Sequence, residues 1–132
     1  MRFALGFALM SALIVPAHAQ ETGVAKPNLV LQQLIEGLPK DDKQAVRVLT
    51  ATFKPGDQTV YHSHRFPVTV YVLEGTFELP VQGQPTRAIK RGDAFQIPPE
   101  TPHAGGKPVD AKSIILITYV VEKGKPLASP AA

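Results

Sequence analysis

Residues 61–79, YHSHRFPVTVYVLEGTFEL, place two histidines one residue apart, ahead of a mostly apolar run and a glycine. On a β-strand, residues i and i+2 leave the same face, so His62 and His64 would point the same way with their roots roughly 7 Å apart. Imidazoles can then converge on one ion at metal–nitrogen distances of about 2.0–2.1 Å. Taken alone, the pair fits a metal site or an ordinary surface histidine pair.

Short apolar runs separated by glycine- and proline-rich turns surround this stretch. Their spacing predicts an all-β sandwich or barrel. A segment at 29–35 fits either a short helical turn or an edge strand. We expect strands at residues 46–53, 59–64, 68–73, 76–81, 86–90, 94–97 and 114–121.

The first 19 residues predict a secretory signal peptide. A basic start, an apolar run over 4–15 and the sequence Ala17-His18-Ala19 form the pattern of such peptides. The apolar run is too short to span a bilayer, although an uncleaved anchor is the alternative. The pattern predicts a periplasmic or secreted protein that has no membrane attachment once the signal is cleaved.

Charge and cysteine content narrow the function classes. The net charge of +3, or +2 once Arg2 is lost with the signal, is too small to indicate nucleic-acid binding. The chain has no cysteine, so a buried core must stabilise it without disulfides. We expect an N-terminal extension at 20–45, one domain at 46–121 and a loose C-terminal tail at 122–132.

A third histidine strengthens the case for a metal site. Signal cleavage would remove His18 and leave His62, His64 and His103. The last of these lies 39 residues beyond His64, after a glycine-aspartate turn, a short predicted strand and a proline-rich loop. The few histidines of the mature chain thus lie in two places that a β-fold could bring together.

Two motifs around these histidines resemble those of the cupin family over about residues 46–121. The first cupin motif, G-x5-H-x-H-x3,4-E-x6-G, is matched by Gly56, His62, His64 and Gly75. The second, G-x5-P-x-G-x2-H-x3-N, is matched by Gly92, Pro98 and His103. Three positions depart from the family pattern, where Val68 replaces the glutamate, Glu100 the glycine and Lys107 the asparagine.

The resemblance implies a cupin double-stranded β-helix, that is, a jelly-roll barrel, and a homodimer. It also implies that His62, His64 and His103 bind a divalent metal ion. Val68 cannot act as a ligand, so three neutral imidazoles would leave the ion its full charge and open positions. Such a site favours an anionic small-molecule ligand such as an enolate, thiolate, phenolate or carboxylate. Imidazole suits iron, manganese, nickel, copper and zinc, so the metal stays open.

Several functions are compatible with this pattern. Three-histidine cupins include iron-dependent dioxygenases, so the resemblance implies a dioxygenase-like enzyme, with isomerases and decarboxylases also open. A non-catalytic periplasmic cupin that binds a ligand or metal is the alternative. A third is an assembly role, in which residues 29–35 pair with a second subunit. Glu100 is a candidate for a replacement carboxylate or a general base, or else an ordinary exposed loop residue.

Overall fold

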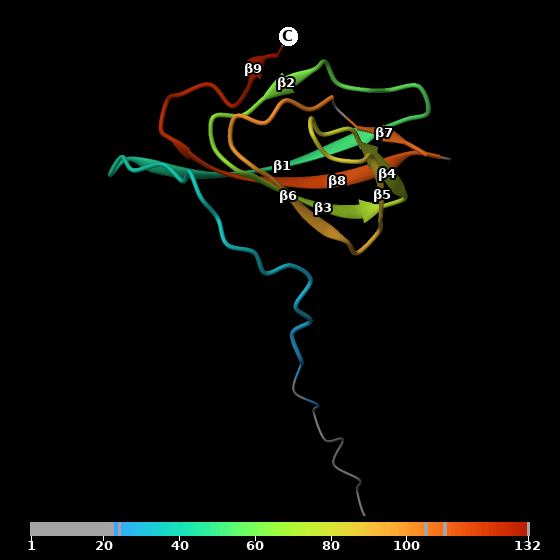
Figure 1. Ribbon diagram of the computed structural model, residues 1–132. Coiled ribbons are helices and arrows are strands. Elements are labelled where there is room, and N and C mark those ends of the chain that lie inside the picture. Colours follow the sequence, from blue (N-terminus) through green and yellow to red (C-terminus); the bar gives the residue numbers. More distant parts are fainter. Residues whose placement is uncertain (1–22, 24, 105, 110, 132) are drawn as a thin grey trace, which may run out of the picture.

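The computed structural model describes residues 23, 25–104, 106–109 and 111–131, which form an all-β structure (Figure 1). The prediction of the fold class is confirmed. No helix within these ranges has the length and apolar character needed to cross a membrane. The described strands are β1 (Gln44–Phe53), β2 (His62–Ser63), β3 (Val68–Glu74), β4 (Thr76–Leu79), β5 (Arg87–Lys90), β6 (Ala94–Ile97), β7 (Lys107–Pro108), β8 (Ser113–Glu122) and β9 (Ser129–Pro130).

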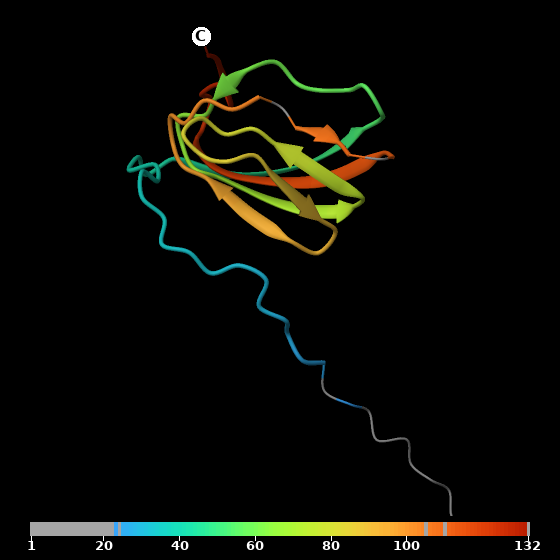
Figure 2. The same cartoon turned by 45° about the vertical axis from the view of Figure 1, so that its right-hand side comes forward.

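The strands form two main sheets and a short pair beside one end (Figures 1 and 2). The larger sheet has the order β1-β8-β3-β6, the smaller has the order β5-β4-β7, and β2 pairs with β9. β1 and β8 pair antiparallel from Gln44 opposite Glu122 to Phe53 opposite Ser113. The chain passes repeatedly from one main sheet to the other, as a jelly-roll barrel requires.

The hydrophobic core lies between the two main sheets. On β3, Val68, Val70 and Val72 are each at most 4% exposed, and they alternate with residues that point outward. This period of two is the pattern of a strand with one buried face. Phe77 of β4, 1% exposed, packs against Phe53 with ring centroids 5.1 Å apart. Burying one such side chain contributes roughly 1.5–3 kcal/mol to folding.

The glycine that ends the first motif has a steric role in this fold. Gly75 turns the chain from β3 into β4 with a φ of 76°. A Cβ atom there would lie 2.6 Å from the carbonyl oxygen of Lys112. Both the positive φ and the lack of space therefore favour glycine at position 75. The lack of space comes from the close approach of the chain just before β8.

The structure corrects three expectations about local structure. The sequence predicts a loose C-terminal tail at 122–132, whereas Glu122 ends β8 and residues 129–130 form β9 against β2. The tail finds an unpaired strand edge there, which composition does not reveal. Residues 29–35 form neither a helical turn nor a strand. The strand predicted at 59–64 is reduced to residues 62–63, and the predicted signal peptide at 1–19 lies outside the described residues.

Candidate metal centre

Backbone pairing brings the two histidine-bearing segments together. His62 lies on β2, and His103 lies in the loop between β6 and β7. The N–H of His62 donates to the carbonyl of His103 at 3.0 Å, and the N–H of His103 donates to the carbonyl of His62 at 2.8 Å. One residue past β2, the carbonyl of His64 accepts from the N–H of Glu100 at 2.7 Å. These bonds fix the histidine backbones against each other.

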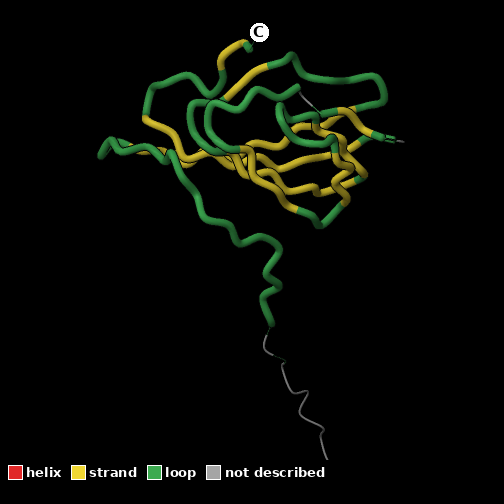
Figure 3. The backbone as a smooth tube through the Cα atoms, in the orientation of Figure 1, coloured by secondary structure: helices red, strands yellow, loops and turns green. Residues whose placement is uncertain are grey.

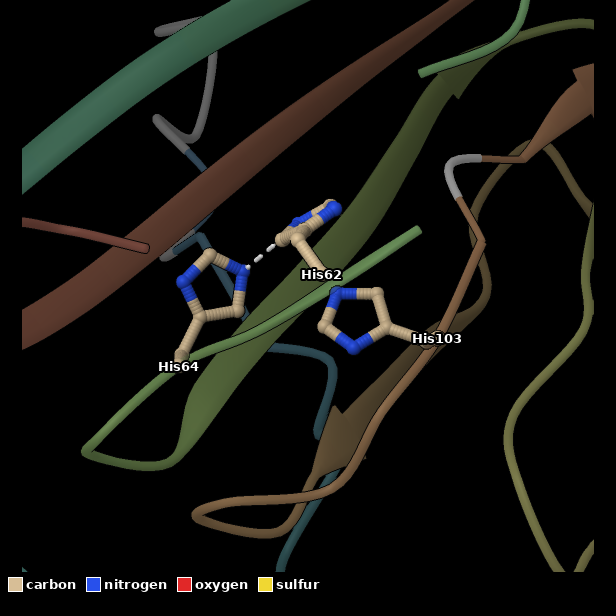
Figure 4. Close-up of side chains that lie close together, drawn as sticks. All are labelled: His62, His64 and His103. Atoms are coloured by element: carbon tan, nitrogen blue, oxygen red, sulfur yellow. Dashed lines mark hydrogen bonds between the residues drawn. The ribbon is translucent and has the colours of Figure 1, made fainter. Parts of the chain in front are cut away.

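The three imidazole rings form one cluster (Figure 4). The ring centroid of His62 lies 4.8 Å from that of His64 and 4.3 Å from that of His103. The centroids of His64 and His103 are 5.1 Å apart. Each histidine offers a ring nitrogen within 4.8 Å of the other two. The Nε2 atoms of His62 and His64 are 3.1 Å apart, close enough for both to bind one ion at about 2.0–2.1 Å each.

A backbone carbonyl holds the far nitrogen of each ring. Nδ1 of His62 donates to Val60 at 2.7 Å, Nδ1 of His64 to Leu127 at 2.7 Å, and Nδ1 of His103 to Thr101 at 2.9 Å. A carbonyl only accepts, so each Nδ1 must carry the proton. In a neutral imidazole the Nε2 atom is then bare, with its lone pair available. This is the outer support that metal-binding histidines have in proteins.

The tautomers make the donor set fit a cation. When both rings are neutral and carry their protons on Nδ1, the bare Nε2 atoms of His62 and His64 face each other at 3.1 Å. Two lone pairs at that distance repel each other, and a positive ion between them removes the repulsion. Among the described residues no carboxylate belongs to this cluster. The donors are those of an all-imidazole site.

Burial keeps His64 and His103 neutral. Burial lowers the pKa of His103 to about 4, although its bond to the Thr101 carbonyl opposes the shift. Burial also lowers the pKa of His64, against the bond to Leu127 and with a smaller contribution from the nearby His62. At neutral pH both rings are therefore free of the second proton that would compete with a metal ion.

The histidines lie beside a cavity of about 160 Å³ inside the barrel. Its walls come from both main sheets and include Phe53, Val70, Phe77, Phe95, Ile115 and Ile117. Val68, where the cupin motif has glutamate, is 1% exposed and lines the cavity with the histidines. It lies opposite Tyr119 in the β3–β8 pairing. An apolar side chain therefore occupies the position of the fourth ligand.

The other candidate residues differ in whether they line the cavity. Glu100 is exposed on a turn with a φ of 55°, and it is not among the described residues that line the cavity. Tyr119 lines it, with its ring 5.1 Å from that of His64. Sequence reasoning missed Leu127, because a backbone carbonyl can come from any residue and leaves no signal in the sequence.

The family assignment rests on a match over most of the barrel. The family model described as Cupin domain matches residues 49–120, which is more than half of the chain. The chain is a cupin. The match includes all three clustered histidines, begins within β1 and ends within β8. No curated protein matches this cupin.

Solved structures with the same fold match it at low sequence identity. A cupin-like protein from Thermotoga maritima msb8 is 26% identical with a TM-score of 0.55, over 66% of this chain and 65% of that one. An RmlC-like cupin from Shewanella frigidimarina NCIMB 400 is 20% identical with a TM-score of 0.53, over 75% and 95%. DMSP lyase DddQ from Ruegeria pomeroyi DSS-3 is 22% identical with a TM-score of 0.55, over 69% and 44%. This cupin thus spans less than two thirds of the first and third of these proteins.

Proposed function

We propose that this cupin is an exported protein that binds one divalent metal ion through the Nε2 atoms of His62, His64 and His103. The observation that carries the proposal is the convergence of bare Nε2 atoms, two of them 3.1 Å apart, with every Nδ1 atom held by a carbonyl. Burial of His64 and His103 keeps the rings unprotonated and available as ligands. The N-terminal sequence pattern supports export.

The same site is proposed to bind a small organic anion and to act on it as a dioxygenase-type enzyme. Three neutral imidazoles leave the ion its full charge, so the ion supplies Lewis acidity toward an anion and, where it is redox-active, electron transfer. The chain contributes a mainly apolar wall that takes part of the ligand's surface out of water and holds the ligand beside the histidines. Among the described lining residues outside the histidine cluster, Tyr119 is the ionisable side chain. Burial raises the pKa of Tyr119, so it is a protonated hydrogen-bond donor at neutral pH.

A second candidate is a non-catalytic cupin that binds a ligand or metal in the periplasm. It is favoured by the lack of a carboxylate among the described residues that line the cavity, because proton transfer during turnover commonly uses such a group. Oxygen uptake by the iron-loaded protein with small phenols, diketones and thiols separates the two. Turnover supports the enzyme, whereas tight binding without turnover supports the binding protein.

Metal content of the mature protein tests the proposal. Residues 20–132 would be purified from the periplasm without a chelator or a histidine tag, beside His62→Ala, His64→Ala, His103→Ala and the matched control Glu100→Gln. We expect close to one ion per chain in the wild type and in Glu100→Gln, and loss of the ion in each histidine variant. No metal in the wild type, with normal folding of the variants, contradicts the proposal.

A further inference from the structure

The cavity beside the histidines is apolar to an unusual degree for a site that would bind a charged ligand. None of its described lining residues is an aspartate, glutamate, lysine or arginine. Outside the histidine cluster, the described lining has hydroxyl groups only on Thr59 and Tyr119. A ligand therefore meets one strong polar anchor, the metal-binding cluster, and an apolar wall around the rest of its surface.

The replacement of the motif glutamate strengthens this contrast. Val68 lies in the lining at 1% exposure, so the wall is apolar even next to the histidines. A second charged group on a ligand would lose its water there and find no opposite charge, which is costly. Methyl and methylene groups in the same place gain from leaving water. The wall discriminates between these two kinds of ligand in favour of the apolar one.

The volume of the cavity limits the size of the ligand. It measures about 160 Å³, close to that of an engineered apolar cavity of about 150 Å³ that binds benzene. One aromatic ring or a short branched chain fills such a space. A sugar or a peptide would bring polar groups that the described wall does not match.

From these observations we infer that the substrate or ligand is a small, mainly apolar molecule with a single anionic group that binds the metal. Single-ring and short branched compounds belong to this class, whereas dicarboxylates and amino acids do not. The inference rests on the proposed metal site, since the ion is the anchor for the anionic group. It adds which ligands that site accepts.

Two ligands of the same shape but different charge test the inference. 4-Methylpentanoate and succinate have equal numbers of heavy atoms, and they differ in an isopropyl group against a second carboxylate. Zinc-loaded wild-type protein would be titrated with each by calorimetry, because zinc undergoes no redox turnover. We expect 4-methylpentanoate to bind at least tenfold more tightly than succinate.

Variants on opposite faces of β1 link the preference to the cavity. Ala51 lines the cavity, and the neighbouring Thr50 is exposed. Ala51→Leu should keep its zinc and weaken 4-methylpentanoate binding at least tenfold, whereas Thr50→Leu should change neither. Thermal unfolding checks that both fold, and Val70→Ile, which adds a single methyl group to the wall, replaces Ala51→Leu if that variant does not.

The outcomes separate this inference from the metal site itself. Succinate binding as tightly as 4-methylpentanoate overturns the inference and leaves the metal site intact, and so does stoichiometric zinc with no binding of either ligand. Unchanged affinity in Ala51→Leu, or in Val70→Ile where it replaces that variant, also overturns it. A protein that binds no zinc contradicts the proposed function first, and the zinc measurement, made before any ligand is added, identifies that case.

Discussion

The two ends of the described chain are both extended segments outside the barrel, yet only one of them takes part in the site (Figure 3). The N-terminal arm, residues 25–38, forms no strand and its first residues point away from the barrel, and Leu29 and Leu34 on it are 73% and 94% exposed. The C-terminal tail, residues 123–131, lies against β2 through β9. Its Leu127 carbonyl accepts the Nδ1 proton of His64 at 2.7 Å.

The difference shows what attaches an end of this chain to the barrel. β2 is only two residues long, and its backbone pairs with His103 as well as with the tail. The tail therefore completes the pairing of the strand that bears His62, and the N–H of Ala131 adds a bond to the carbonyl of Tyr61 at 3.2 Å. The arm forms no strand. Unpaired backbone groups, rather than composition, decide which end becomes part of the site.

The largest effect we expect comes from acid on the metal-free protein. The pKa of His103 falls from 6.5 unfolded to about 4 folded, because the ring is buried. Below pH 6.5 the unfolded chain takes up the proton first, so the free energy of unfolding has its full value above that pH and decreases down to about pH 4. At 1.36 kcal/mol per pKa unit the loss is about 3 kcal/mol.

Urea unfolding at pH 7 and pH 4 measures this loss, and the two chain ends should alter it differently. Deletion of 20–37 should leave it unchanged. Deletion of residues 126–132 should reduce the loss of stability, because it removes both the burial of His64 and the bond from His64 to the Leu127 carbonyl. The pKa of His64 then returns toward its usual range. His103→Asn should abolish most of the loss. Stability that is constant or higher at pH 4 in the wild type would contradict the assignment.

The next effect concerns metal affinity. Deletion of residues 126–132 removes the carbonyl that holds the Nδ1 atom of His64, and loss of such an outer partner costs about 10–100-fold in metal affinity. Deletion of 20–37 should keep zinc affinity within about twofold of the wild type. Competition with a chromophoric chelator measures both constants, and circular dichroism checks folding. Equal affinity of the two shortened proteins would show that the tail does not support the site.

Much of the barrel and the cluster of histidines could be predicted from the sequence. Period-two burial on β3, the strand at 94–97 and the approach of His103 to His62 all follow from local patterns and motif spacing. Those patterns depend on the identities of side chains, which can be taken directly from the sequence. The position of Val68 in the cavity wall is of the same kind, because a motif position specifies which way its side chain points.

The role of the tail could not be predicted, because it depends on backbone atoms. Leu127 contacts His64 through a carbonyl that every residue type has, 63 positions along the chain. The composition of the tail indicates a loop because of Gly124, Pro126 and Pro130. Composition does not show which strand edge that loop pairs with. The carbonyls that hold His62 and His103 belong to residues two positions earlier, so they come with the local chain geometry.

The smallest effect separates the side chain of Leu127 from its carbonyl. This side chain is partly buried against the core, whereas that of Leu34 in the arm is 94% exposed. Leu127→Ala should lower the free energy of unfolding by about 1–2 kcal/mol, less than the 2–5 kcal/mol typical of a fully buried leucine, and Leu34→Ala should change it by less than about 0.5 kcal/mol. Chemical denaturation of both variants measures the difference.

Zinc affinity should stay within about threefold in Leu127→Ala, because the carbonyl that accepts from His64 remains. A loss of affinity as large as that of the tail deletion would mean that packing of the leucine side chain, and not its backbone bond, positions His64.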